Sequence, residues 1–263
     1  MTQPIRLAKV SDRPRRIGDW AETQTARDIT RSLEMVTAID GPGFTMIAGG
    51  PGTGKTTAVR RFCEARGHDA LYIQAARGEG TVWNFARALS GHWGHAVPHF
   101  NTHAEARFIL AQHIGRNTLL VVDEAQYLHQ RNRRTGQTGE AFEWLRAMAD
   151  EGQFDLVFCG DLHLPRAIEA MPQLQSRMMR PVVIPHASRA DVAAMVAGTP
   201  FETPKAIDAL HQVARMKGGL RNVVNVTRIA QLFAGDGLPT LAHLKAAIMD
   251  MNLSKGGAAN GDA

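Results

Sequence analysis

The stretch Gly49-Gly50-Pro51-Gly52-Thr53-Gly54-Lys55-Thr56 decides the fold of this chain. It matches the phosphate-binding loop pattern G-x-x-x-x-G-K-[ST]. It also lies between an apolar run, 44–48, and a segment of helical character, 56–66, which is the strand-to-helix setting that such a loop requires. Glycine lets the backbone wrap closely around a phosphate chain, so that successive N–H groups and the positive helix N-terminus face the anion. The sequence therefore predicts a nucleotide-binding site.

Side chains at the end of this loop have separate predicted roles. Lys55 is expected to reach the outer phosphates, and the hydroxyl of Thr56 is expected to be a ligand of Mg²⁺. The predicted nucleotide-binding segment comprises Gly49, Gly50, Pro51, Gly52, Thr53, Gly54, Lys55, Thr56 and Thr57.

A second chemical signature follows the apolar run 119–122, which ends in Asp123 and Glu124. In parallel α/β folds the carboxyl ends of the strands bind ligands, beside the phosphate loop. We expect Asp123 to hold Mg²⁺, directly or through water, and Glu124 to orient and polarise the water that attacks the γ-phosphate. A solvated turn would also explain two adjacent carboxylates, but the upstream loop favours the catalytic interpretation.

The hydrophobic pattern predicts an α/β fold followed by helices alone. From 41 to 185, short apolar runs alternate with amphipathic segments, as in a parallel sheet covered by helices. Five strands are predicted at 44–48, 70–75, 118–122, 154–159 and 181–184. The helices between them are predicted near 56–66, 81–91, 103–115, 140–151 and 163–179. Further helices are predicted near 188–197, 203–216, 219–234 and 240–252. The fold class is therefore a P-loop NTPase with a five-stranded parallel sheet between helical layers, followed by a small all-helical domain.

These patterns divide the chain into four predicted segments. They are an N-terminal basic arm and helix at 1–40, an α/β ATPase domain at 41–185, a helical lid domain at 186–252 and a disordered tail at 253–263. Arg13, Arg15 and Arg16 in the arm are either solvated or contact DNA or another subunit.

Composition limits the classes of function. The 263 residues carry a formal net charge of +5, which is compatible with an anionic partner such as nucleic acid. No apolar run reaches the length of a membrane span, and the segment 1–16 has no apolar signal-peptide core. The eleven histidines and two cysteines show no metal-ligand spacing. We therefore expect buried free thiols, no membrane association and a cytoplasmic location.

Several arginines outside the phosphate loop have two possible explanations. The segment 126–139 is polar and carries three arginines and no acid before its end, so it is either a solvated loop or a contact for a phosphate backbone. Arg177 and Arg180 precede the fifth strand, where an arginine either complements a helix end or crosses to the nucleotide of a neighbouring subunit. The Gly-rich helix start 217–221 could aim Arg221 at the phosphates.

Taken together, these motifs resemble an AAA+ ATPase over roughly residues 25–252. The resemblance implies that 49–56 is the Walker A motif and that Asp123 and Glu124 form the Walker B pair. It also implies that Arg221 is the sensor 2 residue.

The same resemblance assigns three further positions. Arg177 is expected to be the arginine finger, with Arg180 as second choice. Asp161 falls where the sensor 1 polar residue of the family lies. ATP and Mg²⁺ are the implied cofactors.

Within that family, the chain is most similar to the small ATPases of DNA transposition, of the Mu B, TniB and TnsC type. The stretch 73–81, followed by a Trp- and Phe-containing helix, resembles the region after their second strand. The resemblance implies nonspecific binding of double-stranded DNA, ATP-dependent assembly into a homo-oligomeric filament or ring, and delivery of target DNA to a transposase. Loops 77–81 and 126–139 would face the DNA. The expected DNA contacts are Arg77, Arg131, Arg133 and Arg134.

Three other functions remain open from the sequence. They are a secretion-associated ATPase of the ExeA type, a helicase loader of the IstB/DnaC type, and a scaffold that binds ATP without hydrolysing it. Glu124 argues against the scaffold, because a pure binding module needs no water-activating carboxylate. The arginine-bearing loop directly after the Walker B strand favours the DNA-binding ATPase.

Overall fold

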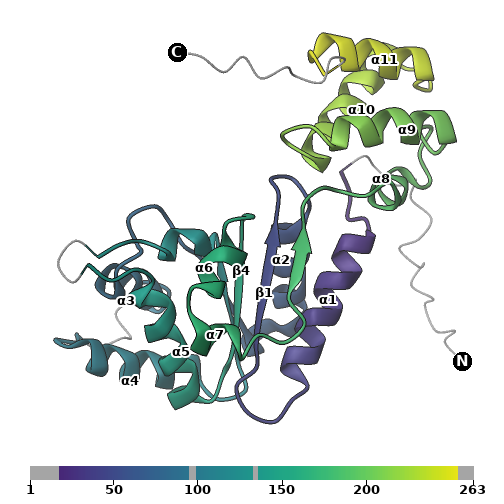
Figure 1. The fold of residues 1–263 in the computed structure, drawn as a ribbon. Coiled ribbons are helices and arrows are strands. Elements are labelled where there is room, and N and C mark those ends of the chain that lie inside the picture. The colour runs from purple at the N-terminus through teal and green to yellow at the C-terminus, as the bar shows by residue number, and fades with distance from the viewer. Residues whose placement is uncertain (1–17, 95–98, 133–135, 254–263) are drawn as a thin grey trace, which may run out of the picture. The chain divides into compact units, whose positions relative to one another are not determined.

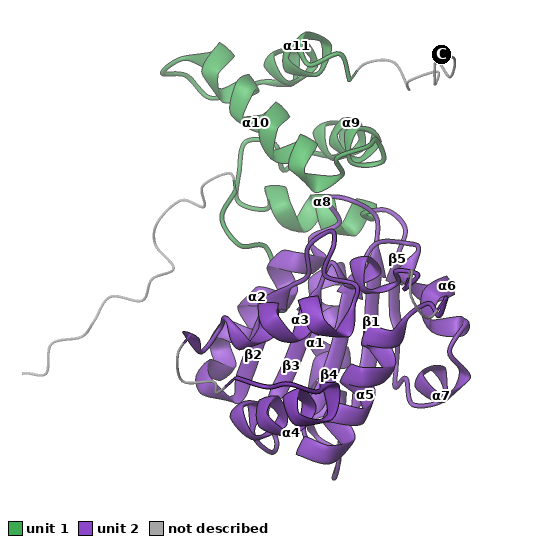
Figure 2. Ribbon diagram, turned by 90° about the vertical axis from the view of Figure 1, so that its left-hand side faces the viewer, with its two compact units in different colours: residues 1–23, 187–263 green, residues 24–186 purple. Residues whose placement is uncertain are grey.

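The computed structural model describes residues 18–94, 99–132 and 136–253. The chain divides into two compact units, one of residues 24–186 and one of residues 1–23 with 187–263 (Figure 2). The arginine cluster of the N-terminal arm, Arg133 and Arg134, and residues 254–263 of the predicted tail lie outside the described residues.

The α/β unit is built on a five-stranded sheet with the order β2-β3-β4-β1-β5, in which every neighbouring pair is parallel. Its strands are β1 (Phe44–Gly49), β2 (Ala70–Gln74), β3 (Leu119–Asp123), β4 (Asp155–Gly160) and β5 (Val182–Ile184). The predicted fold class is confirmed. The register sets Gln74 beside Asp123 and Ala48 beside Gly160, so the carboxyl ends of neighbouring strands meet at one edge of the sheet.

Helices cover both faces of this sheet (Figure 1). On one face lie α1 (Gln24–Thr37) and α2 (Lys55–Arg66). The helices of the other face are α3 (Val82–Ser90), α4 (His103–Ile114), α5 (Glu140–Gly152), α6 (Leu164–Glu169) and α7 (Pro172–Gln175). Strands β1, β3 and β4 are buried along their whole length, which explains their continuous apolar runs. Because α1 packs on α2 and β1, the compact unit begins at Gln24.

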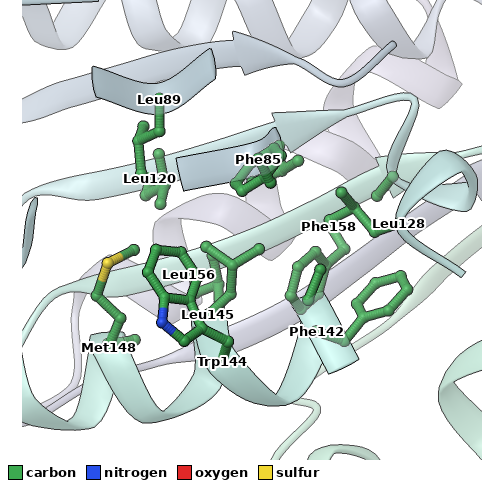
Figure 3. Packing of buried hydrophobic residues seen from close by; sticks show 14 of the residues in the cluster. Phe85, Leu89, Leu120, Leu128, Phe142, Trp144, Leu145, Met148, Leu156 and Phe158 are labelled. Atoms are coloured by element: carbon green, nitrogen blue, oxygen red, sulfur yellow. The ribbon is translucent and has the colours of Figure 1, made fainter. Parts of the chain in front are cut away.

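The main apolar core lies between the sheet and the helices α3 to α7 (Figure 3). Leu120 of β3 and Phe158 of β4 are fully buried there, and the ring of Phe158 meets that of Phe142 edge-on with centroids 4.9 Å apart. Full burial of such a side chain contributes about 1.5–3 kcal/mol relative to exposure. This packing fixes the ends of β3 and β4, where the functional side chains lie.

The single helix predicted at 163–179 is wrong, because the structure has two short helices there, α6 and α7. Met171 lies between them with a non-helical backbone, φ −124° and ψ 85°, and Pro172 begins α7. Proline has no N–H to donate and disfavours helical geometry in the residue before it. The proline therefore divides a segment whose apolar pattern is continuous.

The second unit is helical. Its helices are α8 (Arg189–Val196), α9 (Pro204–Ala214), α10 (Leu220–Ala234) and α11 (Leu241–Asp250). Ser188 and Thr240 cap α8 and α11 with capping boxes, and Thr203 caps α9. A core of its own joins the helices, with Leu210, Val226 and others fully buried. Within the described ranges, no helix combines the length and the apolar character needed to cross a bilayer.

The predicted buried free thiols are confirmed. Cys63 in α2 and Cys159 in β4 are both unpaired and buried. Burial raises the pKa of the Cys63 thiol to about 11, and burial together with the nearby Asp123 raises the pKa of the Cys159 thiol well above its usual value. Neither thiol ionises at neutral pH.

Candidate nucleotide-binding site

The phosphate-binding loop follows β1 and leads directly into α2. Gly52 and Gly54 have φ values of 72° and 91°, which are left-handed conformations that favour glycine. At Gly50, a Cβ atom would lie 2.6 Å from the backbone oxygen of Pro185, so only glycine allows this close approach. Gly50 donates its N–H to the oxygen of Ile184 at 3.0 Å, which ties the loop to the end of β5.

Side chains inside the loop stabilise its curvature. The hydroxyl of Thr53 donates to the oxygen of Gly50 at 3.0 Å. Lys55 is only 8% exposed, and its Nζ donates to the same oxygen at 3.4 Å. Pro51 and Thr57 are exposed. The lysine ammonium is thus held at the concave side of the loop, where a phosphate would bind.

Asp123 is the last residue of β3 and is 1% exposed. Its Oδ2 accepts hydrogen bonds from the hydroxyl of Thr56 at 2.9 Å and from the hydroxyl of Tyr72 at 2.6 Å. Its Oδ1 accepts the N–H of Glu124 at 2.8 Å. The structure therefore brings together the two side chains that the sequence assigned to Mg²⁺.

The donor set at this point fits Mg²⁺. The Thr56 hydroxyl and the Asp123 carboxylate are adjacent hard oxygen donors, and Mg²⁺ in nucleotide sites takes one or two protein oxygens together with phosphate oxygens and water. A dedicated cage of three or more His, Cys, Asp or Glu side chains is absent from the described part of the chain.

Glu124 follows β3 in a left-handed conformation, with φ 54° and ψ 33°. This conformation costs a residue other than glycine about 1–2 kcal/mol. Its Oε2 accepts a hydrogen bond from the amide nitrogen of Gln126 at 2.5 Å, and the amide oxygen of Gln126 accepts the N–H of Asp161 at 3.1 Å. Both the backbone and the side chain of Glu124, the residue assigned to polarising water, are thus constrained.

Tyr72 and Gln126 are site residues that sequence reasoning missed. Tyr72 lies in β2 opposite Val121, and Arg60 lies over its ring, 4.7 Å from the centroid. Burial and the hydrogen bond to Asp123 raise the pKa of the Tyr72 hydroxyl, which therefore stays a neutral donor. No sequence signal identifies Tyr72, because its contact depends on the register between β2 and β3. Gln126 could have been noticed only from its position two residues after Glu124.

The two candidate arginine fingers differ in their surroundings. Arg180 has φ 41°, and its guanidinium donates to the backbone oxygen of Asp28 at 2.8 Å, which ties it to α1. Its own oxygen accepts the hydroxyl of Ser32 at 2.8 Å. The Arg177 side chain is 41% exposed, pairs with Asp150 of α5 and lies over the ring of Phe44. Both arginines are thus engaged within their own subunit, and Arg177 is the more exposed of the two.

Two further predicted site residues lie at different places. Asp161 directly follows β4, and its carboxylate accepts the N–H of His163 at 2.8 Å. Arg221 belongs to the helical unit and is exposed in the first turn of α10. Contact of either side chain with a nucleotide remains a prediction.

The two loops predicted to face DNA pack against each other. A Cβ atom at Gly80 would lie 2.6 Å from the oxygen of Tyr127 and 2.5 Å from Cβ of Gln130. The second loop turns back on itself, because Arg131 and Thr138 form an antiparallel bridge. Arg77 and Arg131 are exposed, one on each loop. Arg133 and Arg134 lie outside the described residues.

Comparison with protein families agrees with this arrangement. Residues 38–168 match the AAA domain family, and residues 176–251 match the family described as Mu B transposition protein, C terminal. The first match contains the phosphate loop and both carboxylates at the end of β3, and the second covers most of the helical unit.

Individual relatives match the chain at low sequence identity. The chain is 23% identical over 235 residues to the ATP-dependent target DNA activator B of Escherichia phage Mu, covering 87% of this chain and 70% of that protein. The protein of the same name from Escherichia phage D108 matches to the same extent.

Solved structures show the same fold. The Aeropyrum pernix ORC1 protein in complex with DNA aligns with a TM-score of 0.60 and 19% identity, over 86% of this chain. The present chain spans only 64% of the length of that protein. Domain III of the Thermotoga maritima replication initiation protein DnaA aligns with a TM-score of 0.53 and 15% identity, over 86% of this chain and 91% of that domain. The chain is thus an AAA+ ATPase, in which an AAA domain is joined to a C-terminal domain of the Mu B transposition protein family.

Proposed function

We propose that this chain is an ATP-dependent DNA-binding ATPase that assembles on double-stranded DNA and activates it as the target of a transposase. The observation that carries the proposal is the contact between Thr56 and Asp123 beside Glu124, which joins both nucleotide motifs in one site. The similarity to the target DNA activator of phage Mu, together with the matching C-terminal family, supports the role in transposition.

The site residues divide the work of ATP hydrolysis. Backbone N–H groups of the loop and the Lys55 ammonium bind the phosphates, and Thr56 and Asp123 hold Mg²⁺. When bound, Mg²⁺ neutralises charge on the phosphate oxygens. Glu124 accepts a hydrogen bond from the attacking water and orients it toward the γ-phosphorus.

Three further residues are assigned to the complete site. We assign Arg177 of a neighbouring subunit to the charge that develops on the γ-phosphate, because its side chain is the more exposed of the two candidates. Arg221 and Asp161 are assigned to sensing the nucleotide. ATP hydrolysis would then depend on assembly, which makes the nucleotide a switch.

The DNA contact is assigned to the two loops that pack together at Gly80. Arg77 and Arg131 present positive charge from both loops, and phosphate contacts of this kind bind DNA without regard to sequence. Arg133 and Arg134 belong to the same proposed contact.

The experiment that tests this function compares DNA binding with ATP, ADP and no nucleotide. Long double-stranded DNA is titrated with protein at several salt concentrations, and the complexes are imaged by negative-stain electron microscopy. We expect filaments or rings on DNA when ATP is present, but not with ADP or without nucleotide. These complexes should dissociate as the salt concentration rises. Lys55→Ala should abolish both ATP binding and assembly. DNA binding that is equal in all three nucleotide states would contradict the proposed switch.

A further inference from the structure

Besides Thr56, two side chains donate hydrogen bonds to the carboxylate pair at the end of β3. The hydroxyl of Tyr72 donates to Asp123 Oδ2 at 2.6 Å, and the amide of Gln126 donates to Glu124 Oε2 at 2.5 Å. We propose that Tyr72 and Gln126 are positioning residues, each of which holds one carboxylate in the orientation that ATP hydrolysis needs. This inference rests on the proposed ATPase function and adds the residues that set the geometry of its site.

Tyr72 completes the hydrogen bonding of Asp123. Thr56 and Tyr72 both donate to Oδ2, and the N–H of Glu124 donates to Oδ1, so three donors from three elements fix both oxygens. Hydrogen bonds from neutral donors to an ionised carboxylate are short and strong. Without the phenol, Asp123 keeps its local bonds to α2 and to its own backbone but loses the restraint from β2. Its oxygen would then be presented less accurately beside Thr56.

A second contact holds the tyrosine ring. The guanidinium of Arg60 lies over the ring, 4.7 Å from its centroid, and donates to the side-chain oxygen of Gln74 at 3.2 Å. Arg60 lies in α2, one turn after Thr56, and Gln74 ends β2. The ring, which projects from β2, is therefore in contact with the helix that carries Thr56. Such outer partners of metal ligands tune metal affinity by orientation.

Gln126 restrains Glu124, the second carboxylate of the pair. Its amide can be oriented in only one way, because the N–H of Asp161 needs an acceptor and the carboxylate of Glu124 needs a donor. A Cβ atom at Gly160 would lie 2.6 Å from the amide oxygen, so glycine at this position makes room for Gln126. The glutamine thus bridges the ends of β3 and β4 and leaves the second oxygen of Glu124 available to water.

The two roles predict different failures, and the first is tested with Tyr72→Phe. This change removes the hydroxyl and keeps the ring beneath Arg60. The affinity for a fluorescent ATP analogue is measured in EDTA and as Mg²⁺ is titrated. We expect unchanged affinity in EDTA and a rise of about tenfold in the Mg²⁺ concentration at half-saturation. Ser90→Ala, at the end of α3, removes a hydroxyl that donates to the oxygen of Arg87 and should leave the Mg²⁺ titration unchanged. A Tyr72→Phe titration within twofold of wild type overturns the role of Tyr72.

The second role is tested with Gln126→Met, which keeps the length of the side chain and removes both hydrogen bonds. At saturating Mg²⁺ and ATP we expect kcat to fall by about tenfold or more, with the Kd for ATP within twofold of wild type. Gln112→Met, at an exposed glutamine of α4, is the matched control and should keep wild-type kcat. Gly160→Ala displaces the amide oxygen and should reproduce the loss of kcat if Gln126→Met does not fold. Wild-type kcat in both variants overturns the role of Gln126.

Wild-type behaviour separates this inference from the function on which it rests. A wild-type chain that neither binds nor hydrolyses Mg·ATP overturns both. A wild-type chain that hydrolyses ATP, with Tyr72→Phe and Gln126→Met indistinguishable from it, overturns the positioning roles alone.

Discussion

Glu124 combines a strained backbone with its proposed chemical role. Its left-handed backbone places the side chain just beyond the end of β3, where Gln126 holds it. Strained residues at strand ends persist only when surrounding contacts fix them. Here the backbone N–H of Glu124 donates a hydrogen bond to the carboxylate of Asp123. A strained residue in the middle of an apolar core strand would have no such chemical role.

Glu124→Gln is expected to separate ATP binding from hydrolysis. The amide keeps the size and polarity of the side chain but cannot accept a proton, so phosphate release should fall by about a hundredfold or more. ATP should still bind, and the protein should stay assembled on DNA, as measured by sedimentation with DNA over time. Glu34→Gln, at an exposed glutamate of α1, serves as control. Rapid release from DNA by the Glu124→Gln variant would argue against hydrolysis as the step that ends assembly.

Asp155 gives a pH-dependent contribution to stability. Burial raises the pKa of this carboxyl, against the lowering effects of the Gly43 N–H, which donates to it at 2.8 Å, and of Arg66. A carboxyl with a raised pKa binds its proton more tightly in the folded state, so the free energy of unfolding decreases as pH rises through the interval between the unfolded and folded pKa values. The resulting penalty is complete above that interval and absent below it.

Asp155→Asn should therefore stabilise the protein at pH 7 and lose this effect as the pH falls toward 4. Asparagine keeps the oxygen that accepts the Gly43 N–H and removes the buried charge. Each kcal/mol gained corresponds to a rise of about 2–4 °C in Tm for a domain of this size. Thermal unfolding followed by circular dichroism at both pH values measures the change, with the exposed Asp69→Asn as control. A Tm difference that is the same at both pH values would be inconsistent with a raised pKa.

At the level of secondary structure, the proposed DNA contact is made by loops and not by strands. The loop before α3 and the loop after β3 are separated by more than forty residues in sequence and meet at Gly80. Because the second loop begins directly after Glu124, its position and that of the carboxylate are connected through the turn η4 (Ala125–Leu128).

Gly80→Ala is expected to disturb DNA binding without disturbing nucleotide binding. The added methyl group would lie 2.6 Å from the backbone oxygen of Tyr127, which forces the two loops apart. Loss of one or two phosphate contacts should lower DNA affinity about fivefold to tenfold and reduce its salt dependence, while ATP affinity stays constant. Fluorescence anisotropy with a labelled duplex measures the DNA affinity and its salt dependence. Gly91→Ala, at the end of α3, controls for a glycine replacement elsewhere. Full DNA affinity in Gly80→Ala would remove the paired loops from the proposed contact.

For the whole molecule, the proposed function requires that one subunit completes the active site of the next. Arg177 is the more exposed of the two candidates for a finger that reaches a neighbouring subunit. A head-to-tail interface of this kind generates a ring or a filament, depending on whether the rotation closes.

Mixing two inactive variants should restore activity if the site is shared. Glu124→Gln lacks the water-orienting carboxylate, and Arg177→Ala lacks the finger. In an equal mixture, about a quarter of the sites combine an intact Glu124 with an intact neighbouring Arg177, so about a quarter of wild-type hydrolysis should return. ATP hydrolysis on DNA is measured for each variant and for the mixture.

Arg180→Ala is the comparison for this experiment. Since Arg180 binds Asp28 of α1, its removal should lower Tm rather than produce a complementing variant. If mixing with Arg180→Ala restores hydrolysis and mixing with Arg177→Ala does not, the finger is Arg180.

The sequence by itself determined the fold class and the chemistry of the central site. The phosphate loop, the apolar strands and the acid pair are local patterns. Each can be recognised within a few residues, from its glycines, its apolar run or its adjacent carboxylates. For this reason the strands, most helices and the contact between Thr56 and Asp123 could be predicted. The helix at 163–179 could not, because its apolar periodicity was continuous while Pro172 interrupted the backbone.

Tertiary structure alone decided which side chains support that chemistry. Tyr72 reaches Asp123 because β2 pairs with β3 in one register, and Gln126 reaches Asp161 because β3 and β4 end side by side. Gly80 brings two loops together for the same kind of reason. Hydrogen bonds and close packing between residues distant in sequence depend on distances of a few tenths of an ångström, which strand pairing fixes and local sequence patterns do not encode.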